Sequence, residues 1–242
     1  MKKIKLILDR ILYSKNPYCP LCKRPLLFTN ELFCPHCENK LTQLPDNRCI
    51  RCGKALNKGH TGLCSDCSKD VPICTHGIAL YPYDTYSREV IFEIKYHNRT
   101  DLGVEMGKLL GSLLKTLTWY ENLNIITVVP LHSETLKTRG YNQAHFIGKG
   151  VSEITKIPLK SDILIKTKQT QDQIGLGKEA RYENMLGTFE VNNSLAVAGK
   201  NILLVDDVYT TGATINSCST VLLASGAKSI CFATVASAQF SD

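Results

Sequence analysis

The chain has 242 residues, of which 43% are hydrophobic and 21% charged, as in ordinary folded proteins and unlike disordered ones. No apolar run approaches the ~20 residues that cross a bilayer, so we expect no integral membrane segment, no export signal and a cytoplasmic location. The net charge of +7 lies in residues 1–75, which hold 13 Lys and Arg against 6 Asp and Glu, whereas residues 76–242 hold 16 of each. Such an excess is usually a solvated face, and nucleic-acid affinity is one of its specific uses.

The first 13 residues are expected to form a short amphipathic helix. Ile4, Ile7, Leu8, Ile11 and Leu12 follow the helical i, i+3, i+4, i+7, i+8 pattern among charged residues. We expect this helix to dock on its own protein; a helix lying on a membrane surface is the alternative.

Eight of the eleven cysteines form two sets with the spacing C-x2-C-x11-C-x2-C, and the second set repeats the first after 30 residues. The two sets are Cys19, Cys22, Cys34, Cys37 and Cys49, Cys52, Cys64, Cys67. Two C-x2-C hairpins present four thiolates, which is the ligand set of a tetrahedral zinc site. Four sulfurs leave no open position for an activated water, so we predict two structural zinc ions.

Disulfides and redox-active dithiols are the alternatives, but no export signal supports the first and four repeated pairs do not suit the second. We favour sequential pairing, in which each set of four binds its own ion, over a cross-braced arrangement. Residues 1–75 therefore form a predicted zinc module with little apolar core that depends on metal to fold. Cys74, Cys218 and Cys231 are expected to be small packing residues.

Residues 76–242 alternate apolar β-like runs with helical stretches, which predicts an α/β domain with a largely parallel sheet. The predicted strands are residues 77–81, 124–130, 161–165, 201–205 and 229–235. The predicted helices are residues 86–96, 101–117, 142–154 and 212–224. Ligands of such sheets bind at the carboxyl ends of the strands.

One strand end carries unusual polar residues. The apolar run 202–205 leads into Asp206 and Asp207, and Thr210–Thr214 follow at the expected start of a helix. Hydroxyls and backbone N–H groups there suit a phosphate, Gly212 permits close approach, and the carboxylates suit sugar hydroxyls or a magnesium-bound water. A ribose 5-phosphate has both features, although an ordinary strand end with a helix cap would also begin this way.

These residues carry a resemblance. Residues 202–214 resemble the PRPP-binding loop of type I phosphoribosyltransferases. Together with Val129-Pro130-Leu131-His132, the Arg-Gly-Tyr-Asn-Gln-Ala segment 139–144 and both cysteine sets, they resemble the ComF family of competence proteins. The fold that this implies is a type I phosphoribosyltransferase-like domain preceded by a double zinc module.

The resemblance also implies roles for individual residues. Asp206, Asp207 and Arg139 would be the catalytic groups, with magnesium accompanying PRPP. The residues implied to bind PRPP are Asp206, Asp207, Thr210, Thr211, Gly212, Ala213, Thr214, Leu131, His132 and Arg139. Residues 166–177 would close over the site. The family often has a basic residue after the histidine of the 130–132 turn, but this chain has Ser133, Glu134 and Thr135, so Lys137 would have to substitute.

Arg139, His132 and Lys95 also have plain structural interpretations: a helix-start charge, a satisfied loop histidine and a solvated helical lysine. For the whole protein, the resemblance favours the handling of single-stranded DNA in natural transformation, with PRPP or ribose 5-phosphate as ligand and other DNA-uptake proteins as further partners. An active transferase and an adaptor that senses PRPP are the alternatives. The basic residues expected to contact DNA are Lys23, Arg24, Arg48, Arg51, Lys54 and Lys58.

Overall fold

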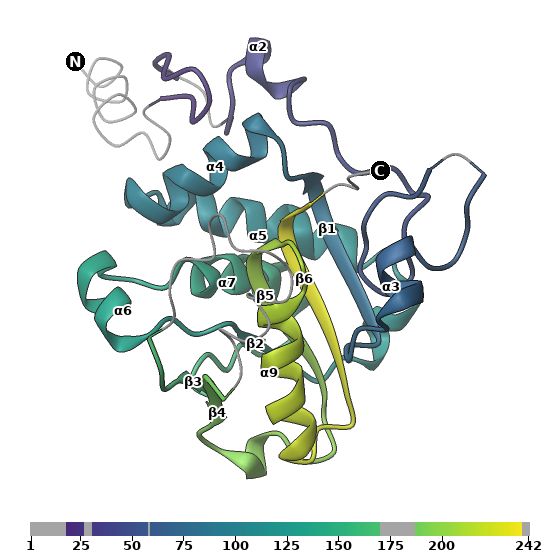
Figure 1. Ribbon diagram of the computed structural model, residues 1–242. Coiled ribbons are helices and arrows are strands. Elements are labelled where there is room, and N and C mark those ends of the chain that lie inside the picture. The colour runs from purple at the N-terminus through teal and green to yellow at the C-terminus, as the bar shows by residue number, and fades with distance from the viewer. Residues whose placement is uncertain (1–17, 27–30, 58, 170–186, 239–242) are drawn as a thin grey trace.

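The computed structural model describes residues 18–26, 31–57, 59–169 and 187–238 (Figure 1). The helix expected in the first 13 residues, Lys58 and most of the 166–177 segment lie outside the described residues. Within the described parts of the chain, no helix is long and apolar enough to span a membrane.

A sheet of four parallel strands forms the centre of the described structure. In the order in which they lie side by side, the strands are β1 (His76–Pro82), β6 (Ser229–Ser237), β5 (Asn201–Tyr209) and β2 (Ile125–Val128). Their residues are almost entirely buried, as the continuous apolar runs predict for a sheet covered on both faces. The expected parallel α/β sheet is therefore confirmed.

The run at 161–165, which was expected to be a further strand of this sheet, has a different partner. β3 (Leu164–Lys166) pairs antiparallel with β4 (Phe189–Val191) in a separate two-stranded sheet. In each strand only the first residue is buried, which is the pattern of a half-exposed antiparallel pair. The small sheet lies beyond the β2 side of the main one (Figure 1).

Helices cover both faces of the main sheet. Those on one face are α4 (Thr85–Tyr96), α5 (Thr100–Leu114) and α7 (Gln143–Thr155), and α9 (Ala213–Ala224) lies on the other (Figure 1). Alternate residues of β5 divide accordingly: Leu203 and Val205 join the core beneath α4, α5 and α7, whereas Ile202 and Leu204 join the core beneath α9. All four helices were expected from the sequence.

Besides β4, three short helical elements in the described α/β part were not expected. They are η1 (Thr118–Asn122), α6 (Ser133–Arg139) and η2 (Ser194–Ala196). None has a buried residue, so the apolar periodicity that reveals longer helices is missing from each.

The cysteine-rich segment, which includes α2 (Pro35–Glu38) and α3 (Ser65–Lys69), borders the β1 edge of the sheet (Figure 1). Its backbone and side chains bond to that edge: the Leu44 N–H donates to the Leu80 carbonyl at 2.9 Å, and Arg48 Nη1 donates to the Ala79 carbonyl at 2.8 Å. The segment thus satisfies acceptors of an edge strand that would otherwise be open to pairing.

The two cysteine sets also extend the two cores of the α/β part. The first set packs into the core shared with α4 and α5, and the second into the core shared with α9 and Phe232. The sequence predicts little apolar core within this segment. In the structure, its cysteines pack into the two cores on either face of the sheet.

Candidate functional site

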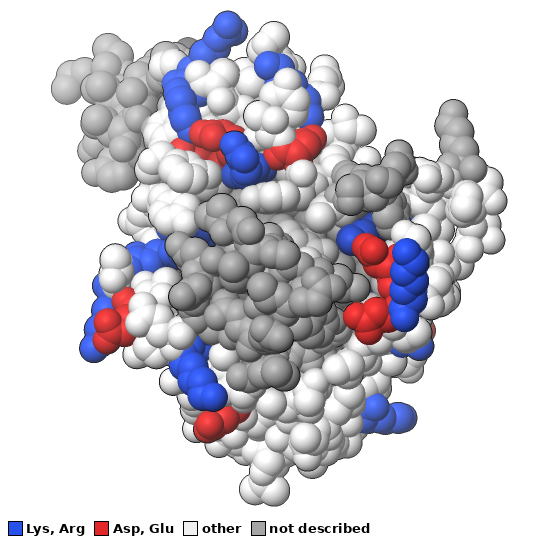
Figure 2. Space-filling view, viewed as in Figure 1, with Lys and Arg blue, Asp and Glu red and all other residues white. Residues whose placement is uncertain are grey.

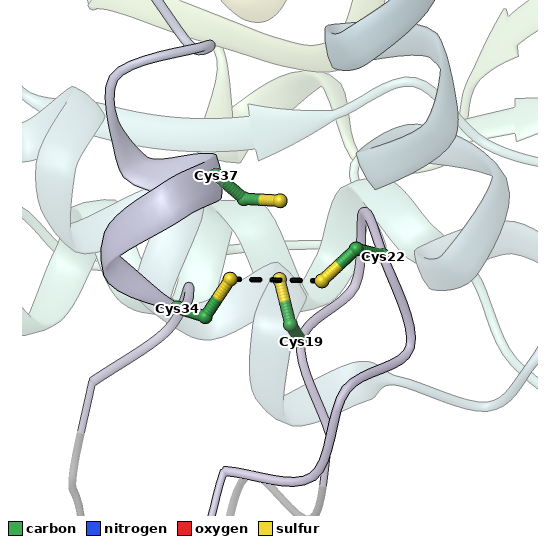
Figure 3. A group of neighbouring side chains, drawn as sticks. All are labelled: Cys19, Cys22, Cys34 and Cys37. Atoms are coloured by element: carbon green, nitrogen blue, oxygen red, sulfur yellow. Dashed lines mark hydrogen bonds between the residues drawn. The ribbon is translucent and has the colours of Figure 1, made fainter.

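Each cysteine set brings its four sulfurs together. In both sets the Sγ atoms lie within 4.8 Å of one another, and Figure 3 shows the first set converging from a hairpin and from α2. Cys22 and Cys34 Sγ are 3.6 Å apart, as are Cys52 and Cys64 Sγ. Tetrahedral zinc with Zn–S bonds of about 2.3 Å requires sulfurs about 3.8 Å apart, so both clusters fit the ion. The sequential arrangement is confirmed, because no cluster mixes cysteines of the two sets among the described residues.

Four of the six basic side chains expected to contact DNA are engaged within the protein. Lys23 Nζ lies 2.9 Å from Glu89 Oε1 and 2.7 Å from Oε1 of Glu93, whose side chain is fully buried in α4. The Arg48 guanidinium donates to main-chain carbonyls, including that of Ala79. These contacts attach the cysteine-rich segment to the sheet and to α4.

Arg51 and Lys54 are engaged by groups in the same N-terminal part of the chain. Arg51 Nη1 donates to the Cys74 carbonyl at 2.9 Å. Lys54 is only 5% exposed, and its Nζ lies 2.9 Å from Asp66 Oδ2. Of the six, Arg24 is exposed and Lys58 lies outside the described residues. Four of these six basic side chains are thus engaged by internal partners among the described residues.

Asp206 and Asp207 lie inside strand β5, not beyond its end. The strand continues to Tyr209 because β6 runs alongside it, pairing Asp206 with Thr234 and Tyr209 with Ser237. The two aspartates are 9% and 5% exposed. Two carboxylates are thus held in a nearly closed site at the carboxyl end of a central strand.

A lysine from α4 neutralises this site. Lys95 Nζ lies 2.8 Å from Asp207 Oδ2, and the Asp207 N–H donates to Asp206 Oδ1 at 2.8 Å. Burial alone would lower the pKa of Lys95, but the charges of Asp207 and Asp206 outweigh it and raise the pKa. Burial and the Asp207 charge raise the pKa of Asp206 to about 8, against the opposing effects of Lys95 and Lys166. The raised pKa favours the protonated form of the Asp206 carboxyl in the ligand-free protein.

The sequence did not decide whether Lys95 belongs to the site or is a solvated lysine. Its only sequence signal is its place directly after Ile94, a residue of the buried face of α4. The contact depends on how α4 lies across β5, which local patterns do not specify. The interpretation as a solvated lysine is wrong.

The segment after β5 has the expected form of a phosphate-binding helix start. Gly212 caps α9 with φ of +84°, in the left-handed region that suits glycine. A side chain at this position would also collide with Tyr209, because a Cβ would lie 2.6 Å from the tyrosine hydroxyl oxygen. Thr210, Thr211 and Thr214 are half-buried around the twelve-residue helix, whose N-terminal N–H groups and dipole favour an anion.

The turn after β2 lies beside the aspartates, since the Val129 N–H donates to the Val205 carbonyl at 3.0 Å. Leu131 is half-buried there. His132 is the N-cap of α6, and its Nδ1 accepts from the Glu134 N–H at 3.4 Å, so it has a structural role in this state.

Arg139 ends α6 and faces a cleft of about 500 Å³. Its guanidinium lies over the Tyr96 ring, 5.3 Å from the centroid, and donates to Gln143 Oε1. The described residues that line the cleft are Lys95, Tyr96, Asn98, Thr135, Thr138, Arg139, Gly140 and Tyr141. Because Lys95 also contacts Asp207, one lysine joins a cationic cleft to the carboxylate pair. Lys137, the expected substitute cation, is exposed on α6 and does not line the cleft among the described residues.

Both parts of the chain match known protein families. Residues 8–68 match the model of the double zinc ribbon domain, and residues 136–239 match that of the phosphoribosyl transferase domain. Competence protein F of Haemophilus influenzae is 29% identical over 175 residues, covering 69% of this chain and 75% of that protein. Competence protein ComFC of Bacillus subtilis is 26% identical over 172 residues, covering 68% and 67%. The chain belongs to the ComF family.

A further relative of this ComF chain is DNA utilization protein YhgH of Escherichia coli, 26% identical over 172 residues, covering 69% of the chain and 74% of the relative. Among solved structures, glutamine PRPP amidotransferase of Bacillus subtilis aligns with a TM-score of 0.39 at 21% identity, covering 58% of the ComF chain but only 30% of its own. A hypoxanthine phosphoribosyltransferase of Staphylococcus aureus aligns with a TM-score of 0.32 at 16% identity, covering 54% and 61%. The family and both domain types rest on the sequence matches.

Proposed function

We propose that this ComF protein binds PRPP or a related 5-phosphoribosyl ligand at the end of β5 and acts in the handling of single-stranded DNA. One observation carries the first part: a buried carboxylate pair, already matched to a lysine, stands immediately before a glycine-capped helix start. In the proposed complex the 5-phosphate accepts from N–H groups at the start of α9, and the ribose hydroxyls bond to Asp206 and Asp207.

The pyrophosphate would occupy the cleft beside these aspartates. Lys95 and Arg139 place two cations there, and a guanidinium can bind phosphate oxygens in a bidentate manner. Asp206 and Asp207 offer the hard oxygen ligands that Mg²⁺ prefers, so they are the residues that would hold magnesium, which would neutralise part of the pyrophosphate charge. When the ligand arrives, Lys95 can exchange its contact with Asp207 for one with phosphate.

Calorimetric titration with PRPP and MgCl2 tests this site. We expect the parent protein to bind and the Asp206→Asn, Asp207→Asn double variant to lose binding. Asp162→Asn is the matched control, because Asp162 is an exposed aspartate outside the site. Equal affinity of the double variant and the parent would exclude the end of β5 as the ribose site.

The DNA part of the proposal is supported by relatives named as competence and DNA utilization proteins. On the face in Figure 2, Lys and Arg are interleaved with Asp and Glu in the described regions, so this face does not present a broad basic surface there. An aromatic group on α4 is a better candidate. Phe92 and Tyr96 are 44% and 58% exposed with ring centroids 4.8 Å apart, His97 meets the Phe92 ring at 5.2 Å, and Arg139 lies over Tyr96.

Exposed aromatic rings next to cations are what sequence-tolerant single-strand binding requires, because bases stack on the rings while cations approach the phosphates. We expect Phe92→Ala with Tyr96→Ala to weaken the binding of a fluorescent oligodeoxythymidine, measured by anisotropy. Leu195→Ala, at an 88% exposed apolar residue on η2, is the control. An unchanged affinity of the aromatic double variant would remove α4 from the DNA surface.

An active phosphoribosyltransferase is the second candidate, and the cleft favours it. A volume of about 500 Å³ is within the range of small-molecule sites, so an acceptor could enter beside the ribose. Transfer of this kind depends on positioning and on stabilisation of developing charge. Release of pyrophosphate from PRPP in the presence of nucleobases or ammonia would support transfer; PRPP binding without release would leave a binding or sensing role.

A further inference from the structure

The second cysteine cluster is in contact with the sheet on the side that carries the proposed phosphate loop. Gly53, the residue after Cys52, has φ of +70°, and a Cβ there would lie 2.6 Å from the Gly77 carbonyl oxygen. A Cβ at Gly77 would in turn lie 2.2 Å from the ring of Phe232. The cysteine hairpin, β1 and Phe232 are therefore packed together without space for a single methyl group.

Lys54 extends from this hairpin toward β5. The Cys49 N–H donates to the Lys54 carbonyl at 2.8 Å, which fixes the backbone of Lys54 in the hairpin. The side chain is 7% exposed, its Nζ lies 2.9 Å from Asp66 Oδ2, and the same Nζ is 5.9 Å from the centre of the Tyr209 ring. A lysine is rarely buried so far unless its charge is matched, so this arrangement serves a purpose other than solubility.

Tyr209 carries the contact to the loop. It is the last residue of β5, is 5% exposed and stacks on Phe232 with ring centroids 4.6 Å apart. Its hydroxyl lies against Gly212, the residue that caps α9. The cysteine hairpin, Lys54, Tyr209 and Gly212 form an unbroken series of packed groups.

A second contact reaches the same helix start. The Ile73 N–H, six residues after the last cysteine of the cluster, donates to Asn216 Oδ1 at 3.3 Å. Asn216 lies in the first turn of α9, where its N–H donates to the Gly212 carbonyl at 2.8 Å. The cysteine-rich segment thus touches both sides of the Gly212 cap.

We propose that Lys54 is a positioning residue through which the second four-cysteine cluster holds the 209–214 segment, by way of Tyr209, in the conformation that receives a phosphate. That this conformation receives a phosphate rests on the proposed function, but the positioning itself is a property of the ligand-free protein. N–H groups that must point at one anion are effective only when they are held in place beforehand.

The test compares Lys54→Met, which keeps the length of the side chain and removes its charge, with Lys69→Met, at an exposed lysine of α3 on the same cluster. Hydrogen exchange of the amides of residues 210–216 is measured in the ligand-free proteins, with zinc content and Tm as checks of the fold. We expect exchange at least about fivefold faster in Lys54→Met, as for a typical coupling between sites, and unchanged in Lys69→Met. Unchanged exchange in Lys54→Met would overturn the proposal.

A double-variant cycle identifies the route. Tyr209→Phe keeps the stacked ring and removes the hydroxyl over Gly212, so the Lys54→Met, Tyr209→Phe protein should exchange no faster than Lys54→Met alone. Additive effects would show that Lys54 does not act through Tyr209. If Lys54→Met loses zinc, the single variant Tyr209→Phe becomes the test. Exchange at residues 210–216 as slow in Tyr209→Phe as in the parent protein would overturn the role of the tyrosine.

PRPP affinity is then measured on the same proteins. Weaker binding by Lys54→Met together with faster exchange supports both proposals. Faster exchange combined with a parent protein that does not bind PRPP supports the positioning and overturns the proposed ligand, so the two failures are distinguishable.

Discussion

Lys95 Nζ and Asp207 Oδ2, on α4 and β5, lie 2.8 Å apart at the carboxyl end of the sheet. The lysine meets the carboxylate where a ribose ligand is proposed to bind, and it also lines the adjacent cleft. An ammonium in this position neutralises the site before a ligand arrives and can turn to an anion afterwards.

Replacing Lys95 by methionine should lower stability and weaken PRPP binding. Asp207 is 5% exposed, and removing its partner leaves a buried charge uncompensated, at a cost of about 1–3 kcal/mol. Urea unfolding at pH 7 measures the change. Lys108→Met, which removes a partly exposed lysine paired with Glu105, should change stability by less than about 0.5 kcal/mol. Equal losses in the two variants would argue against a special role for the Lys95 pair.

Asp206 should make the protein less stable as pH rises from about 4 to about 8. Burial and Asp207 raise the pKa of Asp206 from 3.8 to about 8, so the folded state binds more protons than the unfolded state throughout this window. Stability from this group is complete below the unfolded pKa and is lost as pH rises through the folded one. Asp206→Asn, which does not titrate, should therefore gain stability over the parent as pH rises toward 8, by up to several kcal/mol, since each unit of pKa difference corresponds to about 1.4 kcal/mol.

Thermal unfolding of Asp206→Asn and the parent at pH 5 and pH 8 measures this difference. The variant and parent should be close at pH 5 and diverge at pH 8. A gap of the same size at both pH values would show that Asp206 does not titrate in this range.

The protein should hold two zinc ions, and their removal should destabilise both halves of the structure. The first cluster shares a core with α4 and α5, and the second shares a core with α9, so chelation removes support from both faces of the sheet. Metal analysis gives the stoichiometry. Trp119, the single tryptophan of the chain, stacks on His76 of β1 at 5.4 Å and reports on the sheet edge during EDTA titration.

A metal content of one ion or none would contradict the two-site prediction. If chelation unfolded residues 1–75 while the Trp119 signal and the Tm of the rest stayed unchanged, the cysteine segment would be an independent module, as its composition suggested.

Lys23→Met should lower stability without changing the salt dependence of DNA binding. Its ammonium pairs with Glu93, a fully buried carboxylate, so the variant leaves that charge with weaker compensation and should lose about 1–3 kcal/mol. A lysine that contacts DNA phosphate contributes roughly −0.7 to the logarithmic salt slope on single strands. The slope of log affinity against log salt concentration is measured for both proteins between about 50 and 200 mM salt. If the slope of Lys23→Met is smaller in magnitude by that amount, Lys23 contacts DNA phosphate.

Local patterns in the sequence determined much of this protein. Cysteine spacing predicted two four-cysteine sites and only favoured their sequential pairing, which the structure then showed. The apolar runs predicted the four strands of the main sheet and its four long helices. These features are encoded over short stretches, where periodicity and turn residues act directly on the backbone. The Asp206–Thr214 segment was identifiable for the same reason.

Only the tertiary structure determined the surroundings and the partners of the charged residues in these segments. Asp206 and Asp207 are inside a strand because β6 extends past them, Lys95 is a partner of Asp207 because α4 crosses β5, and Lys54 is buried because its hairpin packs on Phe232 and Tyr209. Each of these contacts joins residues far apart in the chain, and a lysine has the same local pattern whether it ends in water or against a carboxylate. Its environment is fixed only when the elements pack, because burial and charge pairing are properties of the assembled fold.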